Sequence, residues 1–193
     1  ILTTALDNWV AGIMQATEGY VMSWDAVNEI ISGEDKDGDG FYDLRSASNA
    51  DADTKSNFYW ADYLGNETVV PTVIKMAHKY YAGDGNLKLF INDFNLESWW
   101  DDNKKLKSLI HWIEVWESSD IIKIDGIGTQ MHVSYILNEE DQKKQEAAIE
   151  NMFKLMAATG KLVKISELDM RVVKKAFGEG IKTENITEEM HMK

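Results

Sequence analysis

The sequence predicts an α/β fold in which parallel strands alternate with crossover helices. Three observations lead to this prediction: four short β-favouring apolar runs, amphipathic stretches between them, and polar residues where each run stops. The chain has 193 residues, of which 44% are apolar, so one sizeable domain with a packed core is expected. No linker divides the chain, and residues 1–193 are interpreted as one unit.

The elements are expected in a regular order. Apolar residues at helical spacing predict an amphipathic helix over about residues 4–17, with Gly19 as its stop. Further helices are predicted from residue 68, around residues 106–116 and over residues 138–159, with a short helical piece at 58–64. The four strands are predicted at residues 20–27, 87–94, 121–132 and from 162 to the glutamate at 167.

Composition excludes several classes of function. The net charge of −13, without a cluster of Lys or Arg, argues against nucleic acid as a partner. No uncharged apolar run approaches the roughly 20 residues that span a bilayer, so no membrane segment is expected. The chain has no cysteine, which excludes disulfides and thiolate metal sites.

Two glutamates lie at the ends of predicted strands. Glu29 ends the first strand, in the stretch Ser-Trp-Asp-Ala-Val-Asn-Glu, and Glu167 ends the fourth. A single glutamate at such a place is more often a solvent-exposed surface residue. Two carboxylates on the ends of parallel strands, however, are the arrangement that glycoside hydrolysis requires, because one protonates the leaving oxygen and the other attacks or activates water.

The long connection over residues 32–56 has two interpretations. It far exceeds the usual roughly 2 to 6 residues between strand and helix, which indicates a functional or mobile segment. Asp35, Asp37, Asp39 and Asp43 fall at positions 1, 3, 5 and 9 of a calcium-loop pattern. Because position 12 is Ser46 instead of the bidentate glutamate, an acidic solvated turn remains the alternative to a Ca²⁺ site.

Four motifs, in one order, resemble those of the retaining endo-β-1,4-xylanases of glycoside hydrolase family 10. The motifs are Trp24-Asp25-Ala26-Val27-Asn28-Glu29, Leu89-Phe90-Ile91-Asn92-Asp93-Phe94-Asn95, Asp125-Gly126-Ile127-Gly128-Thr129-Gln130-Met131-His132 and Ile165-Ser166-Glu167-Leu168-Asp169. The resemblance covers the chain from its first helix to about residue 171. It departs from the family at Phe94, where Tyr is usual, and at Met131, where Gly is usual.

The resemblance implies catalytic roles. The fold would be part of a TIM (β/α)8 barrel, roughly its strands four to seven with their helices. Glu29 would be the acid/base and Glu167 the nucleophile in xylan hydrolysis by double displacement, without a catalytic cofactor. His132 and Asp169 would form a hydrogen-bonded chain that orients Glu167 and keeps it ionised.

The resemblance also implies the residues that contact the sugar. Asn28 would hold the 2-hydroxyl of the sugar being attacked, Gln130 would line the same subsite with His132, and Trp24 would help keep water from Glu29. Without the family, Asn28, Gln130 and His132 are equally well explained as ordinary buried polar residues that find partners. The substrate would be xylan or a xylo-oligosaccharide.

The chain is therefore interpreted as the C-terminal portion of a catalytic barrel that lacks the first three strands and the eighth. A half-barrel leaves an open sheet edge, so we expect the segment to need the remaining barrel segment of the same protein and to be inactive alone. Two alternatives stay open: another retaining β-1,4-glycanase, such as a cellulase or mannanase, and a non-catalytic carbohydrate- or calcium-binding fragment. Family resemblance implies a secreted, periplasmic or cell-surface location.

Overall fold

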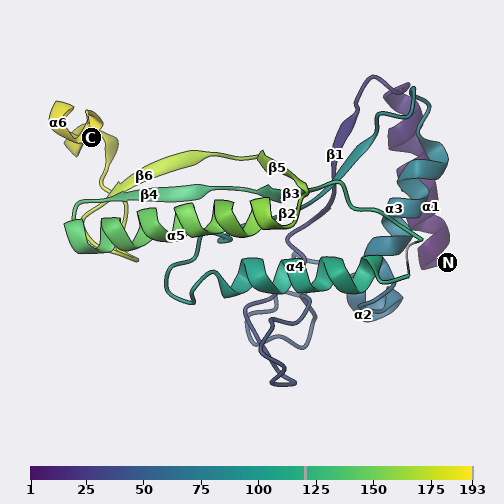
Figure 1. The fold of residues 1–193 in the computed structure, drawn as a ribbon, viewed down its shortest axis with the longest axis horizontal. Coiled ribbons are helices and arrows are strands. Elements are labelled where there is room, and N and C mark those ends of the chain that lie inside the picture. Colours follow the sequence, from purple (N-terminus) through teal and green to yellow (C-terminus); the bar gives the residue numbers. More distant parts are fainter. Residues whose placement is uncertain (120, 193) are drawn as a thin grey trace.

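The computed structural model describes residues 1–119 and 121–192, and its elements alternate as an α/β chain should (Figure 1). The element bounds are α1 Leu2–Ala16, β1 Ser23–Asn28, α2 Ala61–Leu64, α3 Val69–Tyr80, β2 Lys88–Asp93, α4 Lys104–Glu117, β3 Gly126–Thr129, β4 His132–Ile136, α5 Glu139–Ala158, β5 Leu162–Ile165, β6 Asp169–Val173, a 3₁₀ turn Thr183–Asn185 and α6 Glu188–His191.

The strands form two parallel sheets that continue one another. The larger has the order β1-β2-β3-β5, and the smaller consists of β4 and β6. Residues 130–131 separate β3 from β4, and residues 166–168 separate β5 from β6, so each pair is one path with a break. In Figure 1, β4 and β6 run away from the main sheet as a ribbon alongside α5.

Two strand predictions need correction. The third strand was expected at residues 121–132, but only Gly126–Thr129 is strand there, and His132 begins a new strand instead of ending the old one. The reason is the backbone of Met131, whose φ of 59° interrupts the extended conformation. Glycine adopts this left-handed conformation at less cost than other residues.

The first strand is shifted and less buried than the sequence suggested. β1 begins at Ser23 instead of residue 20, and none of its residues is fully buried. Tyr20, expected within it, is 84% exposed. β1 is the edge of the sheet and pairs with β2 alone, so its apolar side chains Trp24, Ala26 and Val27 pack against the core but stay only partly buried.

The core lies between the middle of the sheet and its helices. Leu89 and Ile91 on β2 and Ile127 on β3 are fully buried, as are side chains of α3, α4 and α5. The helical predictions hold: the stretches around 4–17, 106–116 and 138–159 become α1, α4 and α5, and Gly19 and Gly160 adopt left-handed φ after α1 and α5. The piece predicted at 58–64 is helical only at Ala61–Leu64.

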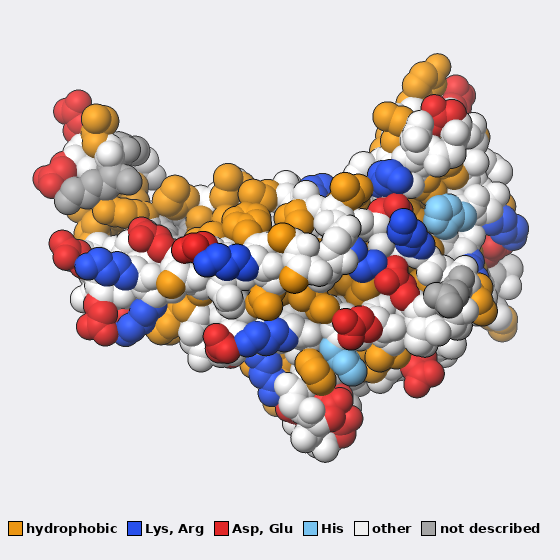
Figure 2. Space-filling view, viewed as in Figure 1, with side chains coloured by type: hydrophobic (Ala, Val, Ile, Leu, Met, Phe, Trp, Pro, Cys, Tyr) orange, Lys and Arg blue, Asp and Glu red, His pale blue; other side chains and the backbone are white. Residues whose placement is uncertain are grey.

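The opposite edge of the sheet and the ribbon expose apolar surface. Figure 2 shows hydrophobic side chains gathered over this part of the molecule. The exposed members are Leu162, Val163, Ile165, Leu168 and Met170. Within the described residues, no helix combines the length and apolar character that crossing a bilayer requires.

Candidate active site

Glu29 follows β1 in an unusual backbone conformation. Its φ is 56°, a left-handed value that a non-glycine residue adopts at some cost, and its N–H donates to the carbonyl of Asn92 at 2.9 Å. β1 also carries an irregular register between Asp25 and Val27, just before this turn. Such outliers beside a strand end indicate a side chain whose direction is specified by the fold.

Both carboxylate oxygens of Glu29 have partners. Oε1 accepts from Nε2 of Gln130 at 2.9 Å, and Oε2 accepts from Nη1 of Arg45 at 3.2 Å. The side chains of Arg45 and Glu29 are 27% and 36% exposed, so the ion pair is only partly screened by water.

Amide side chains connect Glu29 to Glu167. Nε2 of Gln130 also lies 3.3 Å from Oδ1 of Asn28, and that oxygen accepts from Nδ2 of Asn92 at 2.8 Å. The same Nδ2 donates to Oε1 of Glu167 at 3.2 Å. Glu29 follows one edge strand of the four-stranded sheet and Glu167 follows the other, yet both belong to one hydrogen-bond network, because the carboxyl ends of parallel strands lie on the same side of the sheet.

Gly128 leaves the room that Asn92 requires. A Cβ at this position would collide with Oδ1 of Asn92, which accepts from the hydroxyl of Ser166 at 2.8 Å. A side chain on β3 would therefore displace the amide that bridges the two halves of the network. Glycine is required here for close approach and not for a turn.

His132 lies between two carboxylates. Its Nε2 is 3.2 Å from Oε2 of Glu167, and its Nδ1 is 3.0 Å from Oδ2 of Asp169. The hydrogen bond to Asp169 and, to a lesser extent, the contact with Glu167 raise the pKa of His132 above its ordinary value. The parallel pairing of β4 with β6 sets this geometry, because His132 and Asp169 are register partners.

A buried ion pair lies beneath the network. Nζ of Lys105 is 2.7 Å from Oδ1 of Asp93, and the two side chains are 8% and 0% exposed. Oδ2 of Asp93 accepts from the backbone N–H of Ile31 at 3.0 Å, which ties the end of β2 to the segment after Glu29. Burial raises the pKa of Asp93 and lowers that of Lys105, because both charges lose hydration.

Trp24 and Phe94 have more peripheral positions. The indole of Trp24 donates to the carbonyl of Val21 at 3.0 Å, and the ring lines a cavity of about 500 Å³ together with Glu29 and Arg45. The ring of Phe94 lies 3.4 Å below Nζ of Lys105, a cation–π contact.

The acidic loop brings together three of the four aspartates predicted as calcium ligands. Carboxylate oxygens of Asp35, Asp37 and Asp39 lie within 4.8 Å of one another. Asp43 does not join this cluster, because its Oδ2 accepts from the backbone N–H of Lys36 at 2.9 Å. Nζ of Lys104 lies 2.8 Å from Oδ2 of Asp35 and lowers the pKa of that carboxyl.

Several site residues were missed from the sequence. Asn92, Asp93 and Ser166 lie inside the motifs but received no role, and their strand-end positions were the available signal. Lys105 lies on α4 and Arg45 within the long loop, and no local pattern distinguishes either from a surface cation.

Comparison with known proteins identifies the family. The family model of Glycosyl hydrolase family 10 matches residues 1–192. Endo-1,4-beta-xylanase A of Thermoanaerobacterium saccharolyticum is 28% identical over 172 residues, which cover 89% of this chain and 12% of that protein. Exoglucanase XynX of Acetivibrio thermocellus is 27% identical, again over 89% of this chain and 12% of that protein.

A solved structure is similar in fold. It is an intracellular xylanase mutant of Thermoanaerobacterium saccharolyticum in complex with xylotriose, with a TM-score of 0.61 at 24% identity, and the match covers 88% of this chain and 44% of that one. This chain therefore spans less than half of that structure's length. By the family match over nearly all its residues, the chain belongs to glycosyl hydrolase family 10, and its parallel strands and helices are part of a TIM barrel.

Proposed function

We propose that the protein carrying this chain is a retaining endo-β-1,4-xylanase, with Glu29 as acid/base and Glu167 as nucleophile. The observation that supports this assignment best is the shared network in which Gln130, Asn28 and Asn92 connect the two carboxylates. Retaining hydrolysis needs two carboxyl groups on opposite sides of one glycosidic bond.

In the first step, Glu29 donates its proton to the glycosidic oxygen while Glu167 attacks the anomeric carbon. The leaving sugar departs with that proton, and Glu167 holds the other sugar as an ester. In the second step, the Glu29 carboxylate takes a proton from water, whose oxygen bonds to the anomeric carbon and releases Glu167.

The neighbours of Glu167 suit a nucleophile. The ring of His132, whose pKa Asp169 raises, lies 3.2 Å from Glu167, and its protonated form favours the ionised carboxylate. Asn28, with its amide beside both catalytic side chains, is proposed to hold the 2-hydroxyl of the attacked sugar, and Gln130 to line the same subsite.

The remaining part of the barrel is proposed as the partner of this segment. Both edge strands pair on one side only within the described residues, and apolar side chains remain exposed along β5 and β6. Strands that complete the barrel would cover this surface and pair both edges. Export from the cell is likewise a proposal, which rests on family resemblance alone.

The decisive experiment is to measure hydrolysis of xylan and of an aryl xylobioside with an activated leaving group. Glu29→Ala should lower kcat/KM on xylan by about 10²- to 10⁴-fold, yet spare the first step on the activated substrate, because that leaving group needs no proton. Glu167→Ala should abolish both reactions, and azide should restore activity with inverted product stereochemistry.

A matched control is Glu150→Ala, which removes an exposed α5 carboxylate paired with Lys154. It should leave both rates unchanged. If Glu167→Ala instead kept activity on the activated substrate while Glu29→Ala lost it, the two roles would be reversed.

A second candidate is a retaining β-1,4-glucanase, since a relative of similar identity is named an exoglucanase. Product analysis on xylan and on cellulose decides between them. Binding of xylo-oligosaccharides without any cleavage by the complete protein would instead support the non-catalytic alternative.

A further inference from the structure

The long connection after Glu29 returns to its own starting point. The N–H of Ser32 donates to the carbonyl of Asp43 at 2.8 Å, and the N–H of Arg45 donates to the carbonyl of Ile30 at 2.8 Å. Ile31 and Leu44 form an antiparallel bridge between the two paths. This pairing places Arg45 beside the end of β1, although many residues of loop separate it from Glu29.

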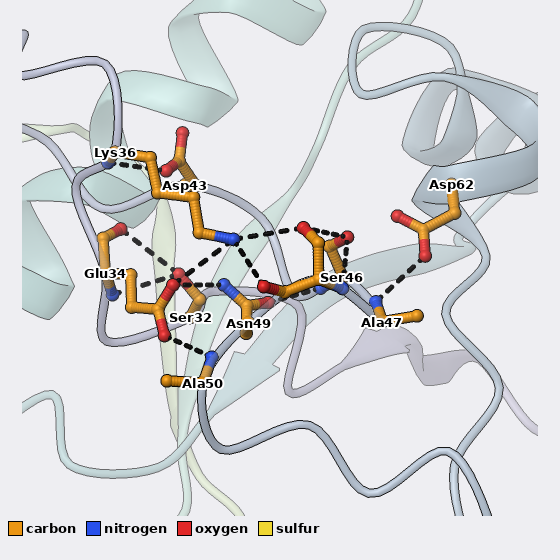
Figure 3. A network of polar contacts seen from close by, with 10 residues as sticks. Ser32, Glu34, Lys36, Asp43, Ser46, Ala47, Asn49, Ala50 and Asp62 are labelled. Carbon is orange, nitrogen blue, oxygen red and sulfur yellow. Dashed lines mark hydrogen bonds and ion pairs between the residues drawn. The ribbon is translucent and has the colours of Figure 1, made fainter.

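A polar network fixes the returning segment (Figure 3). The carboxylate of Glu34 accepts from the N–H of Ala50 at 2.5 Å and from Nδ2 of Asn49 at 3.1 Å, and these bonds lower the pKa of Glu34. Oδ1 of Asn49 in turn accepts from the N–H of Ser46 at 2.5 Å. The residue directly after Arg45 is therefore held by side chains from both ends of the loop.

The loop is also attached to α4. The N–H of Tyr42 donates to the hydroxyl of Ser108 at 2.7 Å, and the indole of Trp112 donates to the carbonyl of Tyr42 at 3.0 Å. The Lys104–Asp35 ion pair adds a third attachment at 2.8 Å. These contacts make the segment around Arg45 a fixed part of the fold, which favours the functional over the mobile interpretation of this long connection.

The loop places one positively charged side chain beside Glu29. Nη1 of Arg45 lies 3.2 Å from Oε2 of Glu29. Among residues 1–119 and 121–192, Arg45 is the one basic side chain that forms an ion pair with this glutamate. The nearby Lys105 is already bound to Asp93 at 2.7 Å.

We propose that Arg45 is a positioning residue for the acid/base, and that the loop exists in its present form to place it there. The guanidinium fixes one carboxylate oxygen of Glu29 and stabilises the charge that appears when the proton leaves for the glycosidic oxygen. The same charged form must take the proton of water in the second step. This inference rests on the proposed function, because it assigns Arg45 a role in that reaction.

The proposal predicts how the pH profile changes when Arg45 is neutralised. The charged groups around Glu29 are Arg45 from the loop, Lys105 from α4 with its partner Asp93 on β2, and Glu167 at the end of β5. Removing the nearest positive charge disfavours the carboxylate form. The two limbs of the pH–activity profile that depend on Glu29 should therefore both move to higher pH.

The test compares Arg45→Gln with Arg45→Lys in the complete protein, with Lys154→Gln on α5 as a control cation far from the loop. With Arg45→Gln, the basic limb of kcat/KM on xylan and the acidic limb of kcat on an activated aryl xylobioside should both shift upward. Arg45→Lys keeps the charge and should restore most of the wild-type profile. A loss of rate without any shift of either limb would overturn the proposal, because it would indicate a merely structural role.

A second measurement does not depend on activity. Carbon-13 NMR can follow the titration of the Glu29 carboxyl carbon in wild type and in Arg45→Gln. An upward move of the midpoint in the variant supports the pairing, and an unchanged midpoint overturns it. The midpoint could also shift in a protein that cleaves no β-1,4-glycan. That result would support the ion pair, but it would refute both the catalytic role of Arg45 and the proposed function.

Discussion

The buried pair of Lys105 and Asp93 should dominate the stability of the site. Lys105→Met removes the cation and leaves the carboxyl of Asp93, whose side chain is 0% exposed, without a charged partner. Breaking a buried pair in this way costs about 3 to 5 kcal/mol, a large part of the roughly 5 to 15 kcal/mol that a domain has in total. The carboxylate of Asp93 also accepts hydrogen bonds from two backbone N–H groups. Because these bonds remain in the variant, we expect a cost toward the lower end of this range.

Urea unfolding of the complete protein measures this cost. With a slope of about 2 kcal/mol per molar urea, a loss of about 3 kcal/mol lowers the midpoint by about 1.5 M. The double variant Asp93→Asn with Lys105→Met removes both charges while it keeps an acceptor for Ile31, so it should recover most of the loss. The reasoning would be refuted if Lys105→Met cost less than about 1 kcal/mol, or if the double variant were as unstable as the sum of both singles.

Three further predictions concern the other parts of the site. The carboxyl groups of Glu29 and Glu167 should lie about 5 to 5.5 Å apart in a crystal structure of the complete enzyme, and a separation of roughly 6.5 to 9.5 Å would indicate inversion instead. Asp169→Asn should lower the pKa of His132, seen by NMR of the ring protons, because Asp169 is the main cause of its elevation. Since the pKa of His132 is raised in the folded state, the stability it contributes is fully present below its ordinary pKa of 6.5 and is lost as pH rises through the folded-state pKa. Ca²⁺ at about 100 times its dissociation constant should stabilise the protein by about 2.7 kcal/mol if the loop over residues 35–43 binds it, whereas an unchanged melting temperature would leave the solvated acidic turn as the explanation.

The order of elements was predictable because it depends on local patterns. Apolar residues at helical spacing identified α1, α4 and α5, and Gly160 identified the end of α5. Strand limits were predicted less well. At Met131 a local backbone conformation overrides the β-favouring sequence around it, and at Tyr20 an apolar residue lies outside the sheet.

By itself, the sequence determined the family, the α/β alternation and the two glutamates at strand ends, since motif order and periodicity are properties of the chain. Only the tertiary structure decided which side chains contact these two glutamates. Asn92 on β2 reaches Glu167 across β3 because Gly128 has no side chain to block it, and Arg45 reaches Glu29 because the loop pairs with its own beginning. These contacts join residues distant in sequence, and their geometry is set by strand register and left-handed backbone positions that no local pattern specifies.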